Sequence, residues 1–232
     1  MSYKMRINKY ISSSGVCSRR KAETYIKEKR VTVNGNLLTN LAYQVKEGDL
    51  VLLDGKEIFP KENKILYLFH KPIHTLCSHE SQGGKKTIYE YLPKNLGLFS
   101  VGRLDYDSEG LLLITNQGDL AQRLAHPSYE VEKEYLVYLD RELEDKHKEE
   151  MLRGLQTSYD YYTPVSILLD GKKRHGYRVI LKEGKKREIR RMFGHFHYDV
   201  KRLIRLRFSH LHLGNLKAGE YRKLTKEEKD LL

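Results

Sequence analysis

Residues 102–116 constrain the fold more than any other segment, because an acid-rich stretch runs directly into an apolar one. The segment reads Gly-Arg-Leu-Asp-Tyr-Asp-Ser-Glu-Gly-Leu-Leu-Leu-Ile-Thr-Asn, with Asp105, Asp107 and Glu109 at alternate positions before Leu111–Ile114. A short continuous apolar run between polar residues is typical of a buried strand. We therefore expect such a strand here, with carboxylates gathered at its start.

The residues alone leave three interpretations of these acids open. If the run is extended, Asp105, Asp107 and Glu109 share one face and could hold Mg²⁺, as in a metal-dependent nuclease. Alternatively, one carboxylate acts alone as a nucleophile or base. The third interpretation is a polar loop with solvated charges.

The charge distribution indicates a polyanionic partner. The 232 residues include 43 Lys or Arg and 31 Asp or Glu, a net charge of +12. Residues 1–30 hold nine basic and two acidic side chains, and residues 172–207 hold fourteen and three, so these two segments carry all of the excess. This pattern predicts two basic faces that bind nucleic acid.

The first sixty residues predict a small unit of two helices and hairpins. Helices are expected over 7–13 and from Arg19 to about Lys29, the second capped by Ser18, and Asn34-Gly35 suits a type I′ turn. The cations Arg19, Arg20 and Lys21 at that helix start oppose the helix dipole, which favours a bound phosphate there.

These residues resemble a known RNA-binding domain. Arg6-Ile7-Asn8-Lys9-Tyr10-Ile11, Cys17-Ser18-Arg19-Arg20-Lys21-Ala22 and Val31-Thr32-Val33-Asn34-Gly35 are similar to the small domain first described in ribosomal small-subunit protein four. The resemblance implies that Arg6, Lys9, Arg19, Arg20 and Lys21 contact RNA. This chain has Lys29 where the family commonly ends its second helix with Gly.

The remaining chain predicts an α+β fold on a mostly antiparallel mixed sheet flanked by helices. Strands are expected over 65–69, 111–114, 134–139 and 177–181, and helices over 141–155 and 186–193. The polar, aperiodic stretch 60–64 is interpreted as a linker. We thus predict an RNA-binding domain over 1–59 and a catalytic domain over 65–232.

Several motifs of this second part occur in the order found in bacterial ribosomal pseudouridine synthases of the RsuA/RluB type. Gly102-Arg103-Leu104-Asp105 with Ser108-Glu109-Gly110-Leu111-Leu112-Leu113 resembles the family signature, and Lys71-Pro72 resembles its Lys-Pro motif. Lys133-Glu134-Tyr135-Leu136-Val137 resembles its tyrosine-bearing strand, and residues 183–193, Glu-Gly-Lys-Lys-Arg-Glu-Ile-Arg-Arg-Met-Phe, resemble its third motif. His74 and Glu188 replace the usual Gly and Gln.

The resemblance implies a reaction and a role for each matched residue. Asp105 would be the catalytic carboxylate, attacking either the uracil ring or ribose C1′ of a flipped uridine, without metal or cofactor. Arg190 would pair with Asp105, Tyr135 would stack on the base and relay a proton, and Leu203 would line the pocket. The remaining predicted contacts are Arg103 and Lys71 with substrate, and Lys185, Lys186, Arg187 and Arg191 with RNA.

The predicted partner is ribosomal RNA, as a structured stem-loop or within a pre-ribosomal particle. No apolar run approaches the ~20 residues of a membrane span, so we expect a cytoplasmic protein, and a monomer. The alternation of Leu203, Leu206 and Phe208 suggests that some cations of 201–207 face solvent and RNA. The alternative function is a non-catalytic ribosomal RNA-binding or ribosome-assembly factor.

Overall fold

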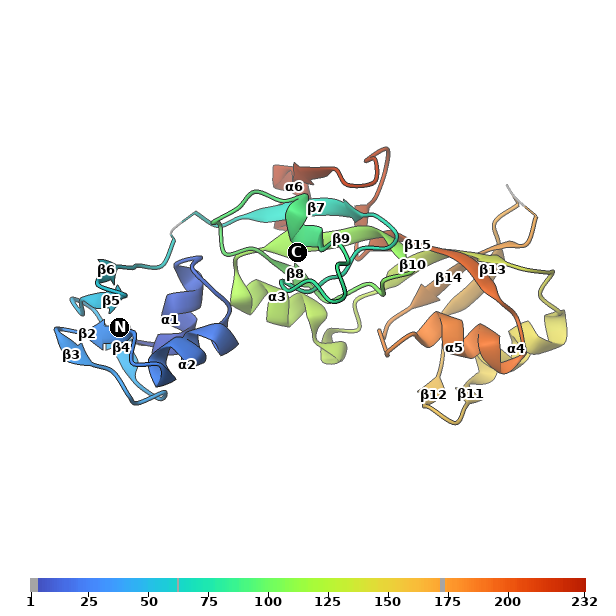
Figure 1. Cartoon of the computed structure of the whole chain (residues 1–232). Helices are drawn as coiled ribbons and strands as arrows, with labels where there is room; N and C mark the ends of the chain where they lie inside the picture. Colours follow the sequence, from blue (N-terminus) through green and yellow to red (C-terminus); the bar gives the residue numbers. More distant parts are fainter. Residues whose placement is uncertain (1–3, 62, 172–173) are drawn as a thin grey trace. The chain divides into compact units, whose positions relative to one another are not determined.

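The computed structural model describes residues 4–61, 63–171 and 174–232, so Lys172 and Lys173 of the basic run lie outside the described residues. The chain forms two compact units (Figure 1). Of the described residues, the first unit contains those of 4–65, 93–99 and 115–117, and the second contains those of 66–92, 100–114 and 118–232. The domain boundaries at residues 59 and 65 stay predictions.

The first unit contains two helices and short antiparallel strands. Its elements are β1 (Lys4–Arg6), α1 (Ile7–Ser13), α2 (Arg19–Lys27), β2 (Val31–Val33), β3 (Asn36–Leu37), β4 (Gln44–Lys46), β5 (Val51–Leu53) and β6 (Lys56–Glu57). The Ser18 hydroxyl accepts the Lys21 N–H, as the predicted cap requires. Asn34 and Gly35 both adopt positive φ between β2 and β3, which is the backbone of the predicted type I′ turn.

Helix α2 ends two residues before Lys29, the residue that replaces the usual glycine of the family. The Lys29 N–H donates to Ile26 O at 3.0 Å and the Arg30 N–H to Tyr25 O at 3.0 Å. These two bonds form a Schellman motif, whose residue beyond the cap adopts the left-handed conformation. Lys29 does so at φ 61°, in the place where glycine fits without strain.

Substituting Lys29→Gly should therefore stabilise the first unit by about 1 kcal/mol, because glycine removes the left-handed penalty of a side chain. Urea denaturation followed by circular dichroism measures the change in the free energy of unfolding. Lys27→Gly is the matched control within the helix and should destabilise by about 1 kcal/mol. Equal destabilisation by both substitutions would contradict this explanation.

The second unit is built on one large sheet. The strands of this sheet are β7 (Leu66–Lys71), β8 (Phe99–Val101), β9 (Glu109–Thr115), β10 (Lys133–Leu139), β13 (Ser166–Leu169), β14 (Gly176–Leu181), β15 (Val200–Phe208), β16 (Leu211–His212) and β17 (Tyr221–Lys223). Phe99 and Thr115, at the ends of β8 and β9, group with the first unit. The strands β11 (Leu155–Gln156) and β12 (Tyr161–Tyr162) form a separate pair. Its helices are η1 (Ile88–Glu90), α3 (Gly118–Ala125), η2 (Pro127–Tyr129), α4 (Asp145–Arg153), α5 (Glu188–His195) and α6 (Lys226–Asp230).

The main sheet has the strand order β13-β14-β10-β15-β9-β7-β17. The pairs β13·β14, β14·β10, β10·β15 and β7·β17 are antiparallel, whereas β9 and β15 are parallel. The sheet is therefore mixed and mostly antiparallel, and the predicted fold class is confirmed. Strand β9, which follows the acid-rich stretch, is buried along its whole length.

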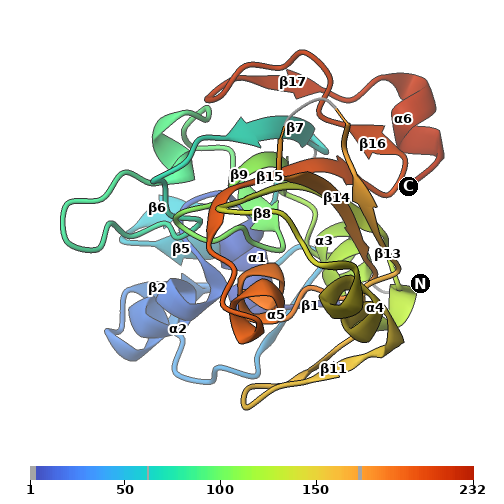
Figure 2. The same ribbon diagram turned by 90° about the vertical axis from the view of Figure 1, so that its right-hand side faces the viewer.

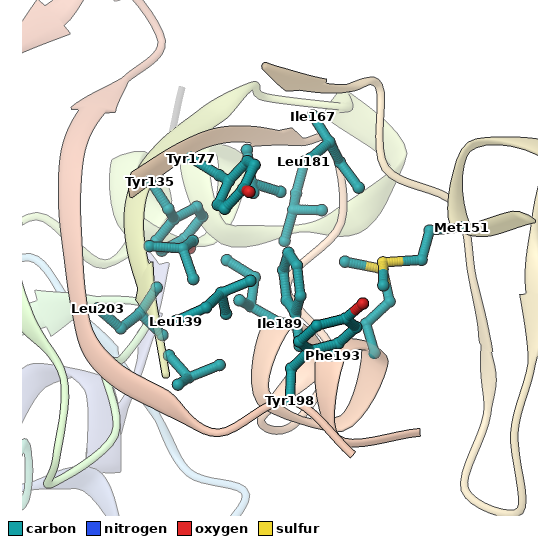
Figure 3. Packing of buried hydrophobic residues seen from close by; sticks show 14 of the residues in the cluster. Tyr135, Leu139, Met151, Ile167, Tyr177, Leu181, Ile189, Phe193, Tyr198 and Leu203 are labelled. Atoms are coloured by element: carbon teal, nitrogen blue, oxygen red, sulfur yellow. The ribbon is translucent and has the colours of Figure 1, made fainter. Parts of the chain in front are cut away.

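Helices α4 and α5 cover one face of the β13-β14-β10-β15 half of the sheet, as both views show (Figures 1 and 2). Val137, Val179 and Phe193 are completely buried in the resulting core. Tyr135 and Leu203 belong to the same cluster (Figure 3). The two predicted pocket residues thus lie on the face of the sheet that packs against helices.

Two helices differ from the predicted bounds. The helix expected over 141–155 is shortened to α4, because the N–H groups of Leu143 and Glu144 donate to the hydroxyls of Tyr177 and Tyr198 instead of joining a helix. The helix expected over 186–193 begins later, after Arg187, which adopts a left-handed conformation at φ 54°. Within the described part of the chain, no helix has the length and apolarity of a membrane span.

Candidate active site

A pocket of about 1260 Å³ in the second unit contains Asp105. The predicted residues Arg103, Tyr135 and Leu203 line it together with Asp105. Lys185, Lys186 and Arg187, which precede α5, also line it. The structure thus brings together one carboxylate, a tyrosine, an apolar side chain and a basic group of residues. Arg190, Arg191 and Lys71 are not among the lining residues.

The backbone of the Asp105 loop is held at four consecutive carbonyl groups. Asp105 O accepts the Ser108 N–H at 3.1 Å, and Tyr106 O accepts the His74 N–H at 2.7 Å. Asp107 O accepts a hydrogen bond from Arg190 Nη2 at 2.7 Å, and Ser108 O accepts one from Lys71 Nζ at 2.7 Å. These partners come from different parts of the sequence, so the loop that carries Asp105 is fixed by tertiary contacts.

The ion pair predicted between Arg190 and Asp105 is wrong. Arg190 Nε lies 3.3 Å from Asp107 Oδ2, and Arg190 Nη1 donates to Val200 O at 2.8 Å. Arg187 binds the same Asp107 carboxylate through two hydrogen bonds of 3.1 and 3.2 Å. The reason is the turn between Asp105 and Ser108, which directs Asp107 toward α5. Among the described residues, none forms an ion pair with Asp105.

The electrostatics of Asp107 follow from this arrangement. Burial opposes ionisation of its carboxyl, but the Arg187 hydrogen bonds and the Arg190 charge outweigh it and hold the pKa of Asp107 below its usual value. Asp107 is therefore a charged anchor between its loop and α5. Arg190 supports the loop rather than contacting the pocket.

Lys71 holds the Asp105 loop through Ser108 O and does not line the pocket, so the geometry does not support the predicted contact with substrate. Its side chain is fully buried and its ammonium group donates to Pro72 O at 3.0 Å as well as to Ser108 O. Burial lowers the pKa of Lys71 to about 8, although Cys77 and nearby carboxylates oppose the shift. Lys71 is thus a positioning residue at the end of β7.

The Lys71 shift predicts a pH dependence of stability. Folded Lys71 releases its proton near pH 8, whereas the unfolded side chain does so near 10.5, so the unfolded state binds more protons between these values. The free energy of unfolding contributed by Lys71 should therefore rise between pH 8 and 10.5, by up to about 3 kcal/mol.

Urea denaturation at pH 7.5, 8.5 and 9.5 measures this rise in the unmodified chain. Lys71→Met should remove the Lys71 share of the rise and leave that of Lys133, whose pKa burial also lowers to about 8. Lys56→Met, at an exposed position in β6, should leave the whole rise in place. Parallel stability curves for Lys71→Met and the unmodified chain would contradict the assignment.

The two other departures from the family motifs also lie beside this site. His74, in the place of the usual glycine, adopts a left-handed conformation at φ 59° while its N–H holds the loop. Glu188 is buried and accepts the Lys185 N–H at 2.9 Å, and burial raises its pKa. Both replacements therefore keep the local backbone in place.

The three alternating acids do not gather into one metal-binding group. Asp107 pairs with Arg187 and Arg190, and Glu109 lies 2.5 Å from Arg202 Nε. In the part of the chain that the structure describes, no three His, Cys, Asp or Glu side chains are grouped as a metal site. The nuclease interpretation thus lacks the geometry it needs.

Strands β10 and β15 present a common set of side chains to the pocket. Tyr135 is paired with Arg205, and Val137 with Leu203, in the antiparallel register. Paired residues point to the same face of a sheet, as do residues two positions apart. Tyr135, Leu203 and Arg205 therefore share one face, and all three line the pocket.

The sequence prediction missed Arg205, which it grouped with the solvent-facing cations of this strand. Arg205 is 3% exposed. Arg207, two positions later, is also not free, because it pairs with Glu132 and Glu134 at 3.1 and 3.2 Å. The spacing of two between Leu203 and Arg205 was the signal that could have placed Arg205 in the pocket.

The predicted RNA-contacting residues fall into two groups. Arg6, Arg19, Arg20 and Lys21 are exposed in the first unit, and Lys9 is half-buried. In the second unit, Lys186 and Arg187 are exposed, and Lys185 lies close to Glu183 and Asp160. Arg191 lies over the Tyr159 ring, 4.2 Å from its centre.

Comparison with known families agrees with the family that the motifs indicate. Residues 65–195 match the family described as RNA pseudouridylate synthase, and residues 5–51 match the S4 domain. A solved structure described as a pseudouridylate synthase is 26% identical, with a TM-score of 0.71, and the match covers 98% of this chain and all of that one.

Curated relatives match over nearly the whole chain. A dual-specificity RNA pseudouridine synthase, RluF, from Escherichia coli K12 is 38% identical over 97% of this chain and 77% of its own length. An uncharacterised RNA pseudouridine synthase from Aquifex aeolicus is 40% identical over 97% of this chain and 94% of its own length. The chain therefore belongs to the RNA pseudouridylate synthases, carries an amino-terminal S4 domain, and is an isomerase that converts uridine to pseudouridine in RNA.

Proposed function

We propose that the chain isomerises one specific uridine of ribosomal RNA, with Asp105 as nucleophile. The observation that carries the proposal is the placement of Asp105, Tyr135 and Leu203 in one pocket whose lining continues into Lys185–Arg187. A uridine within a helix must leave its stack to enter such a pocket. The basic residues would then hold the flanking phosphates.

The site residues divide the work between them. Asp105 attacks the nucleotide, the bond between uracil N1 and ribose C1′ breaks, and the base rotates and bonds to C1′ through C5. The bond to Asp105 breaks and restores the carboxylate, N1 gains a proton, and C5 loses its proton. Tyr135 stacks on the uracil and relays that proton. Leu203 closes the apolar side, and Arg103 occupies the gap that the flipped base leaves. Lys71 and Arg190 act on the reaction by holding the Asp105 loop.

The two domains serve binding and chemistry respectively. We propose that residues 1–59 dock the RNA through Arg6, Lys9, Arg19, Arg20 and Lys21, that 60–64 link the domains, and that 65–232 catalyse. The protein acts as a monomer in this proposal, because each chain carries both parts. One of its relatives bears the name of a dual-specificity RNA pseudouridine synthase, and ribosomal RNA is the substrate we assign to this chain.

The function is tested with ribosomal RNA fragments tritiated at uracil C5. Formation of the C5 bond releases tritium to water, so we expect release by the unmodified chain, with or without EDTA, and none by Asp105→Asn. Binding to RNA without release from any ribosomal fragment would favour a non-catalytic factor, and Mg²⁺-dependent chain cleavage would favour a nuclease. Mapping pseudouridines in ribosomal RNA from cells lacking the gene then identifies the uridine.

The docking role predicts a change in salt dependence. Replacing Arg19, Arg20 and Lys21 together by Gln should lower RNA affinity and reduce the slope of log affinity against log salt by about 0.7–0.9 for each phosphate that these side chains neutralise. Filter binding over a range of KCl concentrations measures both. Lys56→Gln, an exposed lysine outside the predicted set, should alter neither, and an unchanged slope in the triple variant would contradict the docking role.

A further inference from the structure

Strand β15 carries three arginines, and they differ in how their charges are balanced. Arg202 lies 2.5 Å from Glu109, and Arg207 pairs with Glu132 and Glu134. Arg205, between them, is buried, and within the described ranges no carboxylate forms an ion pair with it. The buried arginine is thus the one without a counter-ion.

The hydrogen bonds of Arg205 are also incomplete. Its Nε donates to Leu111 O at 2.7 Å, which anchors the guanidinium to β9. Its Nη2 is buried and has no hydrogen-bond acceptor among the described residues. A buried cation with no counter-ion and with one N–H group left without an acceptor is costly. An acceptor that arrives with the substrate would offset that cost.

The strand register places Arg205 beside the residues that we expect to hold the uracil ring, and not among those that we expect to contact phosphates. It is paired with Tyr135 and lies two positions from Leu203, the residues expected to hold the uracil ring. Lys186, an exposed cation of the lining, already offers charge to phosphates at the solvent-facing part of the pocket. A uracil ring held between Tyr135 and Leu203 would offer one of its oxygens to this guanidinium as the acceptor.

Both routes open to Asp105 place negative charge on those oxygens. Attack at C1′ breaks the N1–C1′ bond, and its electron pair leaves with uracil as an anion delocalised over N1, O2 and O4. Attack at C6 forms a C6–O bond, and the C5=C6 electron pair moves to O4 as an enolate. In either route, the ring charge is consumed when C5 bonds to C1′. The bond to Asp105 then breaks with its electron pair returning to the carboxylate, the C5 proton leaves to a base, and N1 takes up a proton.

We propose that Arg205 is a catalytic residue that donates a hydrogen bond to a uracil oxygen and stabilises the negative charge formed on the ring. This inference rests on the proposed function. The interaction is stronger with the charged ring than with neutral uracil, so it accelerates the chemical step more than it tightens binding. Because Leu111 O fixes the guanidinium beforehand, the site needs little reorganisation during the reaction.

The test separates chemistry from binding in Arg205→Gln. With saturating enzyme and a ribosomal fragment that the unmodified chain modifies, the single-turnover rate of tritium release should fall about 10²–10³-fold, while the Kd for RNA changes less than about threefold. Arg205→Lys, which keeps the charge, should recover part of the rate. Arg207→Gln, in the same strand, should keep the rate within about twofold.

A fluorine substituent gives a second readout that a merely structural role would not move. Fluorine at C5 stabilises the uracil anion, so the rate loss of Arg205→Gln should be at least about tenfold smaller for 5-fluorouridine RNA, followed as consumption of the 5-fluorouridine after digestion. If Arg205→Gln does not fold, as judged by circular dichroism, the same comparison is made with Arg205→Lys.

Two results would overturn the role of Arg205. One is an unchanged rate, and the other is an equal rate loss on uridine and 5-fluorouridine accompanied by weakened RNA binding, which would assign Arg205 to structure or to a phosphate. Failure of the unmodified chain to release tritium from any ribosomal fragment would instead contradict the proposed function. The two failures are therefore distinguishable.

Discussion

Asp105→Asn should lower the single-turnover rate of pseudouridine formation by on the order of 10⁴-fold or more, because an amide cannot replace a carboxylate nucleophile. Affinity for RNA should change little, since the lost charge is acidic and the basic residues are retained. Tritium release from a ribosomal fragment measures the rate, and filter binding measures the affinity.

Asp107→Asn is the matched control, two residues away. It removes the carboxylate that pairs with Arg187 and Arg190 but keeps the Asp107 backbone carbonyl that accepts from Arg190 Nη2. The loop should therefore loosen without losing its nucleophile, and we expect a loss of about tenfold. A larger loss in Asp107→Asn than in Asp105→Asn would exchange the roles assigned to the two acids.

The second large effect concerns stability and Gly110. This residue has φ +112° and lies opposite Arg205 in the parallel pair of β9 and β15. A Cβ atom there would lie 2.5 Å from Arg205 N and closer still to Arg205 O, so the two strands would have to separate. Gly110→Ala should thus lower the free energy of unfolding by about 3 kcal/mol or more, from overpacking and strained φ together.

Gly102→Ala tests how much of the stability lost in Gly110→Ala comes from the close approach of β9 and β15. Gly102 also has positive φ, at 67°, but a Cβ added there meets no atom within 4 Å. It should cost only the conformational penalty of about 1–2 kcal/mol. Urea denaturation of both variants gives the two values, and equal losses would show that the proximity of the strands contributes nothing.

The strands and turns were predictable from the sequence because they depend on local pattern. The apolar run 111–114 favours a short buried strand, and the Asn34-Gly35 pair favours a type I′ turn, each from its own residues and their immediate neighbours. The departures at Lys29 and His74 were visible too, and both positions are left-handed. These features could be predicted because they depend on the φ angles and side-chain alternation of neighbouring residues.

The partners of charged side chains were not predictable in the same way. Which acid Arg190 would bind depended on the turn between Asp105 and Ser108, and this turn is set by contacts with His74, Lys71 and α5. Some cations of 201–207 were expected to face solvent, and the prediction did not single out Arg205 as the buried one. The resemblance supplied the identity of the site residues, but only the three-dimensional arrangement separated those in the pocket from those behind the loop.

The carbonyl groups of residues 105–108 all accept hydrogen bonds, so we expect the RNA rather than this loop to change conformation on binding. The backbone that carries Asp105, the nucleophile we propose, is held before any nucleotide arrives, so we expect this loop to rearrange little. The free-energy cost of binding then lies mainly in the RNA, which must break base stacking and pairing to flip the uridine into the pocket. Uridines in loops and bulges should therefore be reached more readily than uridines in helices, and the folding of the RNA itself becomes a part of site selection.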